Sequence, residues 1–77
     1  IEKAILETLA FIAYKKSAKQ SEVVKVRSNK AYNHIKHLED HGFITAKQKG
    51  KTRLLSPTKK FYEYFNLRED EDIKVED

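Results

Sequence analysis

Three histidines, His34, His37 and His41, stand at a spacing that raises the question of a metal site. On a helix they fall within about 60° of one another, because each residue advances by about 100°. Zinc needs ligands that converge, whereas this spacing spreads the rings along two turns of roughly 5.4 Å each. We therefore predict no metal site. We expect His41 to favour a helix C-terminus, and His34 and His37 to be ordinary exposed or flanking residues.

No arrangement of nucleophile, base and orienting residue suggests itself, and no Gly-rich phosphate loop occurs. The adjacent carboxylates of Glu39 and Asp40 point in different directions on a helix. The chain has no cysteine, which excludes disulfides and thiolate metal sites. We predict that the protein is not an enzyme and uses no cofactor, so that a binding function remains.

The segment AKQKGKTR, residues 46–53, places Lys47, Lys49, Lys51 and Arg53 at alternate positions around Gly50. Alternate residues of a strand share one face, so the pattern predicts a hairpin with the glycine in its turn and the four cations on one face. Such a face suits a nucleic-acid backbone. It is also typical of the solvated tip of a hairpin, and the pattern alone does not distinguish the two.

The elements that must position these residues belong to a chain of 77 residues, of which 36% are charged and 39% hydrophobic. This suits one small domain, and nothing resembles a signal peptide or a membrane-spanning run, so we expect a cytoplasmic protein without a membrane partner. The chain has no Met, even at residue 1, and we expect it to be a piece of a longer protein.

Charge divides the chain into two parts. Residues 1–67 hold 14 Lys and Arg against 6 Asp and Glu, a net charge of +8, and residues 68–77 hold 2 against 6, a net charge of −4. We predict one domain over residues 1–67 and a disordered acidic tail over 68–77. The tail is a solubilising terminus or the start of a linker, or it lies on the basic body and competes with an anionic partner.

Hydrophobic residues at helical spacing predict helices over residues 1–16, 19–27 and 28–42. The third begins at Ser28 or Asn29 as the N-cap and stops at Gly42 as the C′ residue. Val26 is a further candidate for the inner side of the second helix. The side chains expected to face the core are Ile1, Ile5, Leu9, Ile12, Ala13, Val23, Val24, Ala31, Ile35 and Leu38.

Two short strands, over residues 43–48 and 52–56, flank the turn at Gly50, and Pro57 ends the second strand. A last short helix follows, with Thr58 as its cap and Phe61 and Phe65 as an i, i+4 pair. The expected fold is mainly α with a small β-hairpin. It is a winged helix-turn-helix of three helices, a two-stranded wing and a short C-terminal helix.

In such a fold the third helix can enter the major groove of DNA while the wing follows the backbone. The third helix would offer Lys30, Asn33, His34 and His37 for this purpose, although a lysine-rich solvated face is the common alternative. The DNA-binding candidates are Lys30, Asn33, His34, Lys47, Lys49, Lys51 and Arg53.

The first helix carries a second apolar stripe of Ala4, Thr8 and Phe11 beside its core stripe. Either another chain covers this stripe, or the hairpin or the last helix does. Tyr14 and Tyr62 combine an apolar body with a polar tip, which suits an interface. The candidates for partner binding are Ala4, Thr8, Phe11, Tyr14 and Tyr62.

Three segments, ILETLAFIAYKK, RSNKAYNHIKHLEDHGFI and SPTKKFYEYFNL, resemble the C-terminal winged-helix domain of ScpB, segregation and condensation protein B, a kite-type subunit of SMC complexes. The resemblance covers residues 4–67. The matching positions are Leu6, Glu7, Thr8, Leu9, Ala10, Ile12, Ala13 and Tyr14, then Leu38, Gly42 and Ile44, and finally Thr58, Phe61, Glu63, Tyr64, Phe65 and Leu67.

The resemblance implies a non-catalytic, nucleoid-associated subunit that binds the kleisin ScpA in an SMC condensin, for chromosome segregation and condensation. It also implies a homodimer formed through an N-terminal winged-helix domain that this chain does not include. The alternative hypothesis is a winged-helix DNA-binding transcription regulator. A third combines a kleisin on the first helix with weak nonspecific DNA binding on the wing.

Overall fold

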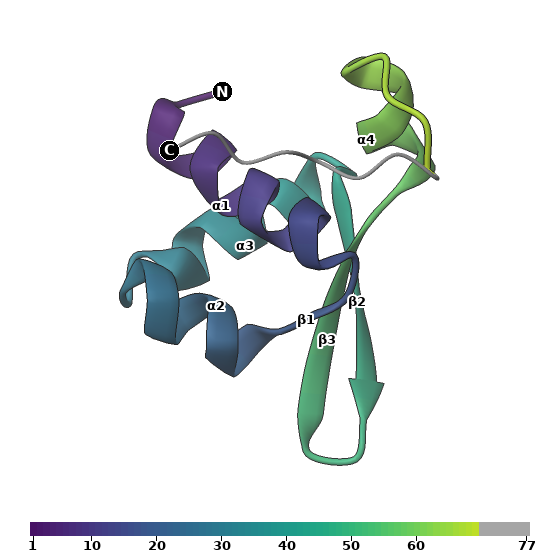
Figure 1. Ribbon diagram of the computed structural model, residues 1–77. Helices are drawn as coiled ribbons and strands as arrows, with labels where there is room; N and C mark the ends of the chain where they lie inside the picture. The colour runs from purple at the N-terminus through teal and green to yellow at the C-terminus, as the bar shows by residue number, and fades with distance from the viewer. Residues whose placement is uncertain (70–77) are drawn as a thin grey trace.

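The computed structural model describes residues 1–69. Within them, four helices and a three-stranded antiparallel sheet form the winged helix-turn-helix that the sequence predicts (Figure 1). The elements are α1 (Lys3–Lys15), β1 (Ala18–Lys19), α2 (Gln20–Arg27), α3 (Ala31–Asp40), β2 (Ile44–Lys49), β3 (Thr52–Pro57) and α4 (Lys59–Tyr64).

The core lies between α1, α2, α3 and one face of the sheet. Ile5, Leu9 and Ile12 of α1 are buried as predicted, because their spacing gives the helix one apolar stripe. Ile1, which was expected to face the core, is exposed, because it precedes the N-cap residue Glu2 and so lies outside the helical stripe.

The inner side of α2 holds the buried Val23 and the half-buried Val24 and Arg27. Val26 was a further candidate for this side, but it is 59% exposed, so that prediction is wrong. It lies roughly 100° around the helix from the middle of the inner side. A helix of eight residues has room for only one narrow buried face.

The junctions of α3 are only partly as predicted. Its N-cap residue is Lys30 rather than Ser28 or Asn29, because the chain first makes a turn in which the backbone N–H of Ala31 donates to the Ser28 carbonyl at 3.0 Å. Gly42 is confirmed at C′, with a φ of +77° that glycine tolerates best.

The sheet has the strand order β1-β3-β2, and the hairpin of β2 and β3 projects beyond the helices (Figure 1). β1 was not predicted, because two residues are too few to show a period of two. Its residues pair with β3, Ala18 with Leu55 and Lys19 with Leu54. The next pairing across the sheet places Lys47 of β2 opposite Leu54.

Thr58 is confirmed as the cap of α4: its hydroxyl accepts from the backbone N–H of Phe61 at 3.3 Å and donates to the carbonyl oxygen of Gly42 at 2.5 Å. The predicted Phe61–Phe65 pair is confirmed, with ring centroids 5.2 Å apart. Among residues 1–69, no helix is long and apolar enough to cross a bilayer. From residue 70 onward, the predicted acidic tail lies outside the described residues.

Candidate functional site

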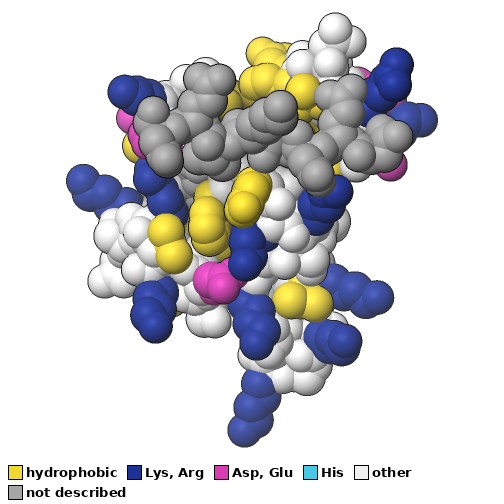
Figure 2. Space-filling model, viewed as in Figure 1, with side chains coloured by type: hydrophobic (Ala, Val, Ile, Leu, Met, Phe, Trp, Pro, Cys, Tyr) yellow, Lys and Arg dark blue, Asp and Glu magenta, His cyan; other side chains and the backbone are white. Residues whose placement is uncertain are grey.

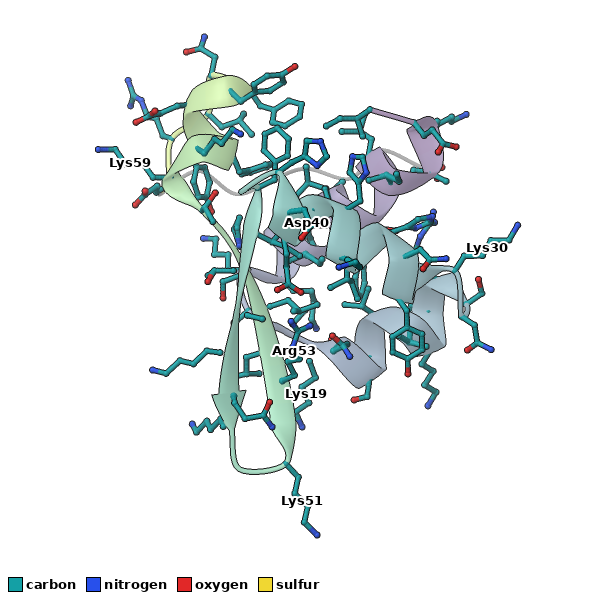
Figure 3. All side chains as sticks on the ribbon, turned by 180° about the vertical axis from the view of Figure 1, so that it is seen from behind. Lys19, Lys30, Asp40, Lys51, Arg53 and Lys59 are labelled. Carbon is teal, nitrogen blue, oxygen red and sulfur yellow. The ribbon has the colours of Figure 1, made fainter. Side chains whose placement is uncertain are left out.

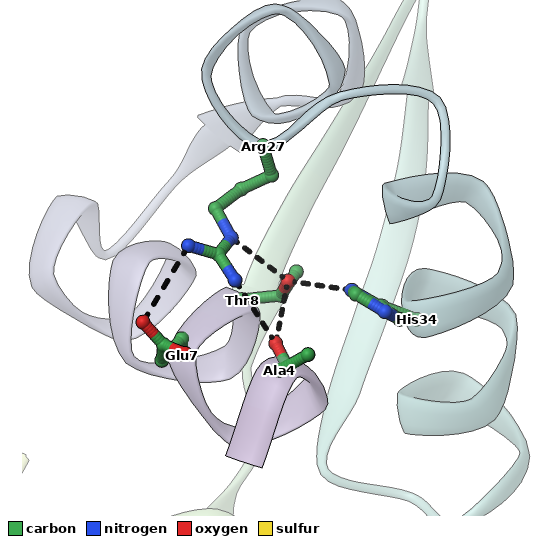
Figure 4. A network of polar contacts seen from close by, with 5 residues as sticks. All are labelled: Ala4, Glu7, Thr8, Arg27 and His34. Atoms are coloured by element: carbon green, nitrogen blue, oxygen red, sulfur yellow. Dashed lines mark hydrogen bonds and ion pairs between the residues drawn. The ribbon is translucent and has the colours of Figure 1, made fainter. Parts of the chain in front are cut away.

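Thr8 lies at the centre of a polar network that joins α1 to α2 and α3 (Figure 4). The side chain is fully buried, and its hydroxyl donates to the carbonyl oxygen of Ala4 at 3.2 Å. The Nε of Arg27 donates to this hydroxyl at 3.3 Å, and Nδ1 of His34 lies 2.9 Å from it. Arg27 also donates to the Ala4 carbonyl at 3.3 Å and approaches the Glu7 carboxylate at 3.7 Å. These contacts hold the three helices together.

The apolar stripe proposed for a partner is therefore largely covered by the chain itself. Thr8 is not accessible, and α2 and α3 cover it, rather than the hairpin or the last helix. Ala4 and Phe11 are half-buried, and Phe11 packs against the core. Tyr62 is buried, whereas Tyr14 is 54% exposed. Of the five partner candidates, Tyr14 alone is mainly exposed.

An apolar pocket of about 280 Å³ opens between α1 and α4. Leu9 and Phe61 belong to the core, whereas Leu6 is 40% exposed and remains accessible. All the lining side chains are apolar, so the pocket has no polar group to orient a small ligand. The lining consists of Leu6, Leu9, Ala10, Phe61, Phe65 and Leu67.

Leu6 and Ala10 were not among the predicted partner residues, although a signal for them exists. They stand four residues apart, and Tyr14 follows four residues later, so the three lie along one side of α1. This side flanks the core stripe opposite to Thr8. A helix that is apolar on both flanks of its core stripe has more apolar surface than one core requires.

The hairpin does not present its four cations on one face, and that prediction is wrong. Lys49 pairs with Thr52 across a two-residue turn, and Gln48 pairs with Arg53. Paired residues of an antiparallel ladder share a face, so Arg53 lies on the face opposite to Lys47 and Lys49. Counting alternate positions through the turn fails, because a two-residue turn exchanges the faces.

Arg53 instead turns toward the helices. Its guanidinium donates to the carboxylate of Glu39 in α3 at 2.6 Å and also contacts the side-chain oxygen of Gln20 in α2. These contacts lie where the hairpin passes the helices, whereas Lys51 extends from the far tip (Figure 3). Arg53 thus joins the wing to the helix-turn-helix pair.

The outer face of the sheet carries Lys47 and Lys49 of β2 together with Lys19 of β1. Lys19 shares this face because it pairs with Leu54, which pairs in turn with Lys47. All three lysines and Lys51 are exposed, and Figure 2 shows Lys and Arg side chains spread over the projecting hairpin.

The exposed side of α3 is of mixed charge. Lys30 and Asn33 are exposed near its start, and Lys36 pairs with Asp40 at 3.8 Å. His34, another DNA candidate, turns inward to Thr8.

The other two histidines do not converge with His34. The rings of His37 and His41 stack with centroids 4.1 Å apart, and Nδ1 of His41 lies 2.8 Å from the carbonyl oxygen of His37. In the described part of the chain, no group of three or more His, Cys, Asp or Glu side chains is arranged to hold a metal ion.

Comparison with known proteins gives one family. The family model described as "Segregation and condensation complex subunit ScpB" matches residues 1–75, which include every helix and strand described above. No curated protein is similar enough to match.

Proposed function

The chain belongs to the ScpB family of segregation and condensation complex subunits, and on that premise we propose that it binds the kleisin ScpA through the side of α1 that faces α4. The family is one of non-catalytic, condensin-associated subunits that act in chromosome segregation. A subunit of this kind acts by holding other chains, so its exposed apolar surface is where a partner is expected.

The observation that carries the proposal is the apolar pocket between α1 and α4. Its volume of about 280 Å³ accommodates a few side chains and lacks the convergent polar groups of a small-molecule site. Leu6 leads into it from α1, and Tyr14 extends the same side of the helix by two turns. A surface of this form suits side chains of a helix or an extended segment of another protein.

We propose that the bound kleisin segment is amphipathic. An amphipathic helix places apolar anchors at i, i+3, i+4 and i+7, and such anchors fill apolar grooves between helices. The exposed phenol of Tyr14 supplies a large, rigid contact with a polar tip at the edge of this surface. Family membership leads to two further predictions. The protein acts at the nucleoid in the cytoplasm, and it dimerises through an N-terminal domain.

Calorimetric titration of the chain with the middle region of an ScpA kleisin tests the proposal. We expect binding that Leu6→Lys weakens by about tenfold or more, because loss of one well-packed anchor costs about 1.4 kcal/mol or more. Lysine is a good helix former, and Leu6 is already 40% exposed, so α1 should remain folded.

Val26→Lys is the matched control. It makes the same type of change at an exposed apolar residue of α2, outside the pocket. We expect it to leave the affinity within about twofold of the parent, since surface changes away from an interface have small effects. Absence of heat at high micromolar concentrations, or equal weakening by both variants, would contradict the proposed surface.

A further inference from the structure

The outer face of the three-stranded sheet concentrates positive charge from two separate strands. Lys47 and Lys49 are two residues apart, roughly 7 Å, and Lys19 lies two strands away from Lys47, roughly 10 Å. Both spacings are close to the Debye length of about 8 Å at physiological salt, so an anionic backbone experiences the charges together. Lys51 adds a fourth charge at the tip of the same hairpin.

Strands β1, β2 and β3 contain no Asp or Glu, and none of the four lysines has an ion-pair partner among residues 1–69. Lys15, Arg27, Lys36, Arg53 and Lys59, in contrast, each lie within 4.0 Å of a carboxylate. The positive charge of this face is therefore not neutralised by ion pairs among residues 1–69.

We propose that this sheet face binds the phosphate backbone of double-stranded DNA without sequence preference, a function beyond kleisin binding and independent of it. The backbone carries a negative charge every 3.4 Å along each strand, so a row of flexible lysines can pair with successive phosphates. The remaining side chains on this face include Thr45, Thr52 and Ser56, whose hydroxyls can donate to phosphate oxygens.

A membrane surface fits this face less well. Interfacial binding needs an apolar side that enters the acyl region, and the face offers only the half-buried Leu54 among hydroxyls and lysines.

Sequence-specific recognition of DNA bases is also disfavoured. The face points away from α3, whose own charges include the Asp40 carboxylate and the Glu39 carboxylate held by Arg53. The DNA is therefore held by its backbone, not read through its bases.

Fluorescence anisotropy with a labelled duplex of arbitrary sequence, titrated with the full chain across a salt series, tests this inference. Four phosphate contacts predict that log affinity falls with log salt at a slope of about −3.6, roughly a hundredfold between 50 and 200 mM. A second duplex of unrelated sequence should bind with an affinity within about threefold of the first, because backbone contacts carry no sequence information.

The triple variant Lys19→Gln, Lys47→Gln and Lys49→Gln should lose about tenfold or more in affinity at low salt and reduce the slope to about −0.9. The matched control replaces three other exposed lysines, Lys3, Lys25 and Lys30, by Gln and changes the net charge equally. It should retain a slope near −3.6.

The inference would be overturned by no binding of the parent at 50 mM salt, by equal losses in both triple variants, or by strong preference for one duplex. Binding to anionic phosphatidylserine vesicles that exceeds binding to DNA would also overturn it. Because the parent's salt slope is measured without substitutions, the test does not depend on how the variants fold. Kleisin titration of the same variants distinguishes this inference from the proposed function, since it should be unaffected.

Discussion

Replacing Thr8 by valine is expected to lower the free energy of unfolding by about 2 kcal/mol, because it removes a buried hydroxyl that links three helices. Valine has nearly the same shape as threonine, so packing against the neighbours is preserved. The hydroxyl contacts Arg27 Nε at 3.3 Å, His34 Nδ1 at 2.9 Å and the Ala4 carbonyl at 3.2 Å. The cost therefore comes from these polar partners.

The size of the expected loss in unfolding free energy depends on which contacts remain in Thr8→Val. A hydrogen bond to a charged group contributes about 1.5–3 kcal/mol and a neutral one about 1 kcal/mol. Arg27 keeps its bond to the Ala4 carbonyl and its approach to Glu7, which places its loss at the low end. His34 is half-buried and can recover part of its loss from water. For a domain of this size, about 2 kcal/mol corresponds to a Tm lower by roughly 8–16 °C.

Urea denaturation followed by circular dichroism measures the change. Thr45→Val is the matched control, because Thr45 is exposed on β2, and it should alter stability by less than about 0.5 kcal/mol. The double variant Thr8→Val with Arg27→Met should lose less than the sum of the single losses, since both changes break the same contact. If Thr8→Val were as mild as Thr45→Val, the network would not stabilise the helix packing.

Three further substitutions test individual contacts. Arg53→Met should destabilise the domain by about 1 kcal/mol in urea denaturation, since it breaks a partly exposed ion pair with Glu39, yet it should leave DNA affinity almost unchanged. Gly42→Ala should cost about 1–2 kcal/mol because of the φ of +77°, and Gly42→Asn should cost less. A Cβ at position 42 would lie 3.5 Å from Lys60 Cδ, an ordinary contact, so steric crowding does not explain a cost. Equal costs for the Ala and Asn variants would therefore contradict a conformational cause. Thr58→Ala should cost about 1 kcal/mol through loss of the α4 cap, and no loss on thermal unfolding would contradict that role.

Local signals in the sequence predicted much of the fold. The spacing of Ile5, Leu9 and Ile12 identified the buried side of α1, and Gly42 marked the end of α3. Thr58 was predicted as the cap of α4 for a similar reason, since capping depends on residues only three positions apart. Features of this type are determined within one or two turns of chain.

Features that depend on distant residues were not predictable in the same way. A stripe on α1 does not reveal which element covers it, and so Thr8 was proposed as a partner contact although Arg27 and His34 cover it. The face of Arg53 depends on the number of residues in the turn, and Lys19 joins the basic face only through the short strand β1. Contacts and strand pairing between distant parts of the chain determine the positions of Thr8, Arg53 and Lys19, and local spacing does not encode them.

Two separate surfaces, one for the kleisin and one for DNA, can be tested by a single NMR measurement on the labelled chain. The kleisin segment should shift the amide resonances of Leu6, Ala10 and Tyr14 on α1. The duplex should shift those of Lys19, Lys47 and Lys49 on the outer sheet face, and each set should respond in the presence of the other ligand. Perturbation of the same resonances by both ligands, or absence of shifts around the α1–α4 pocket with the kleisin segment, would contradict this arrangement.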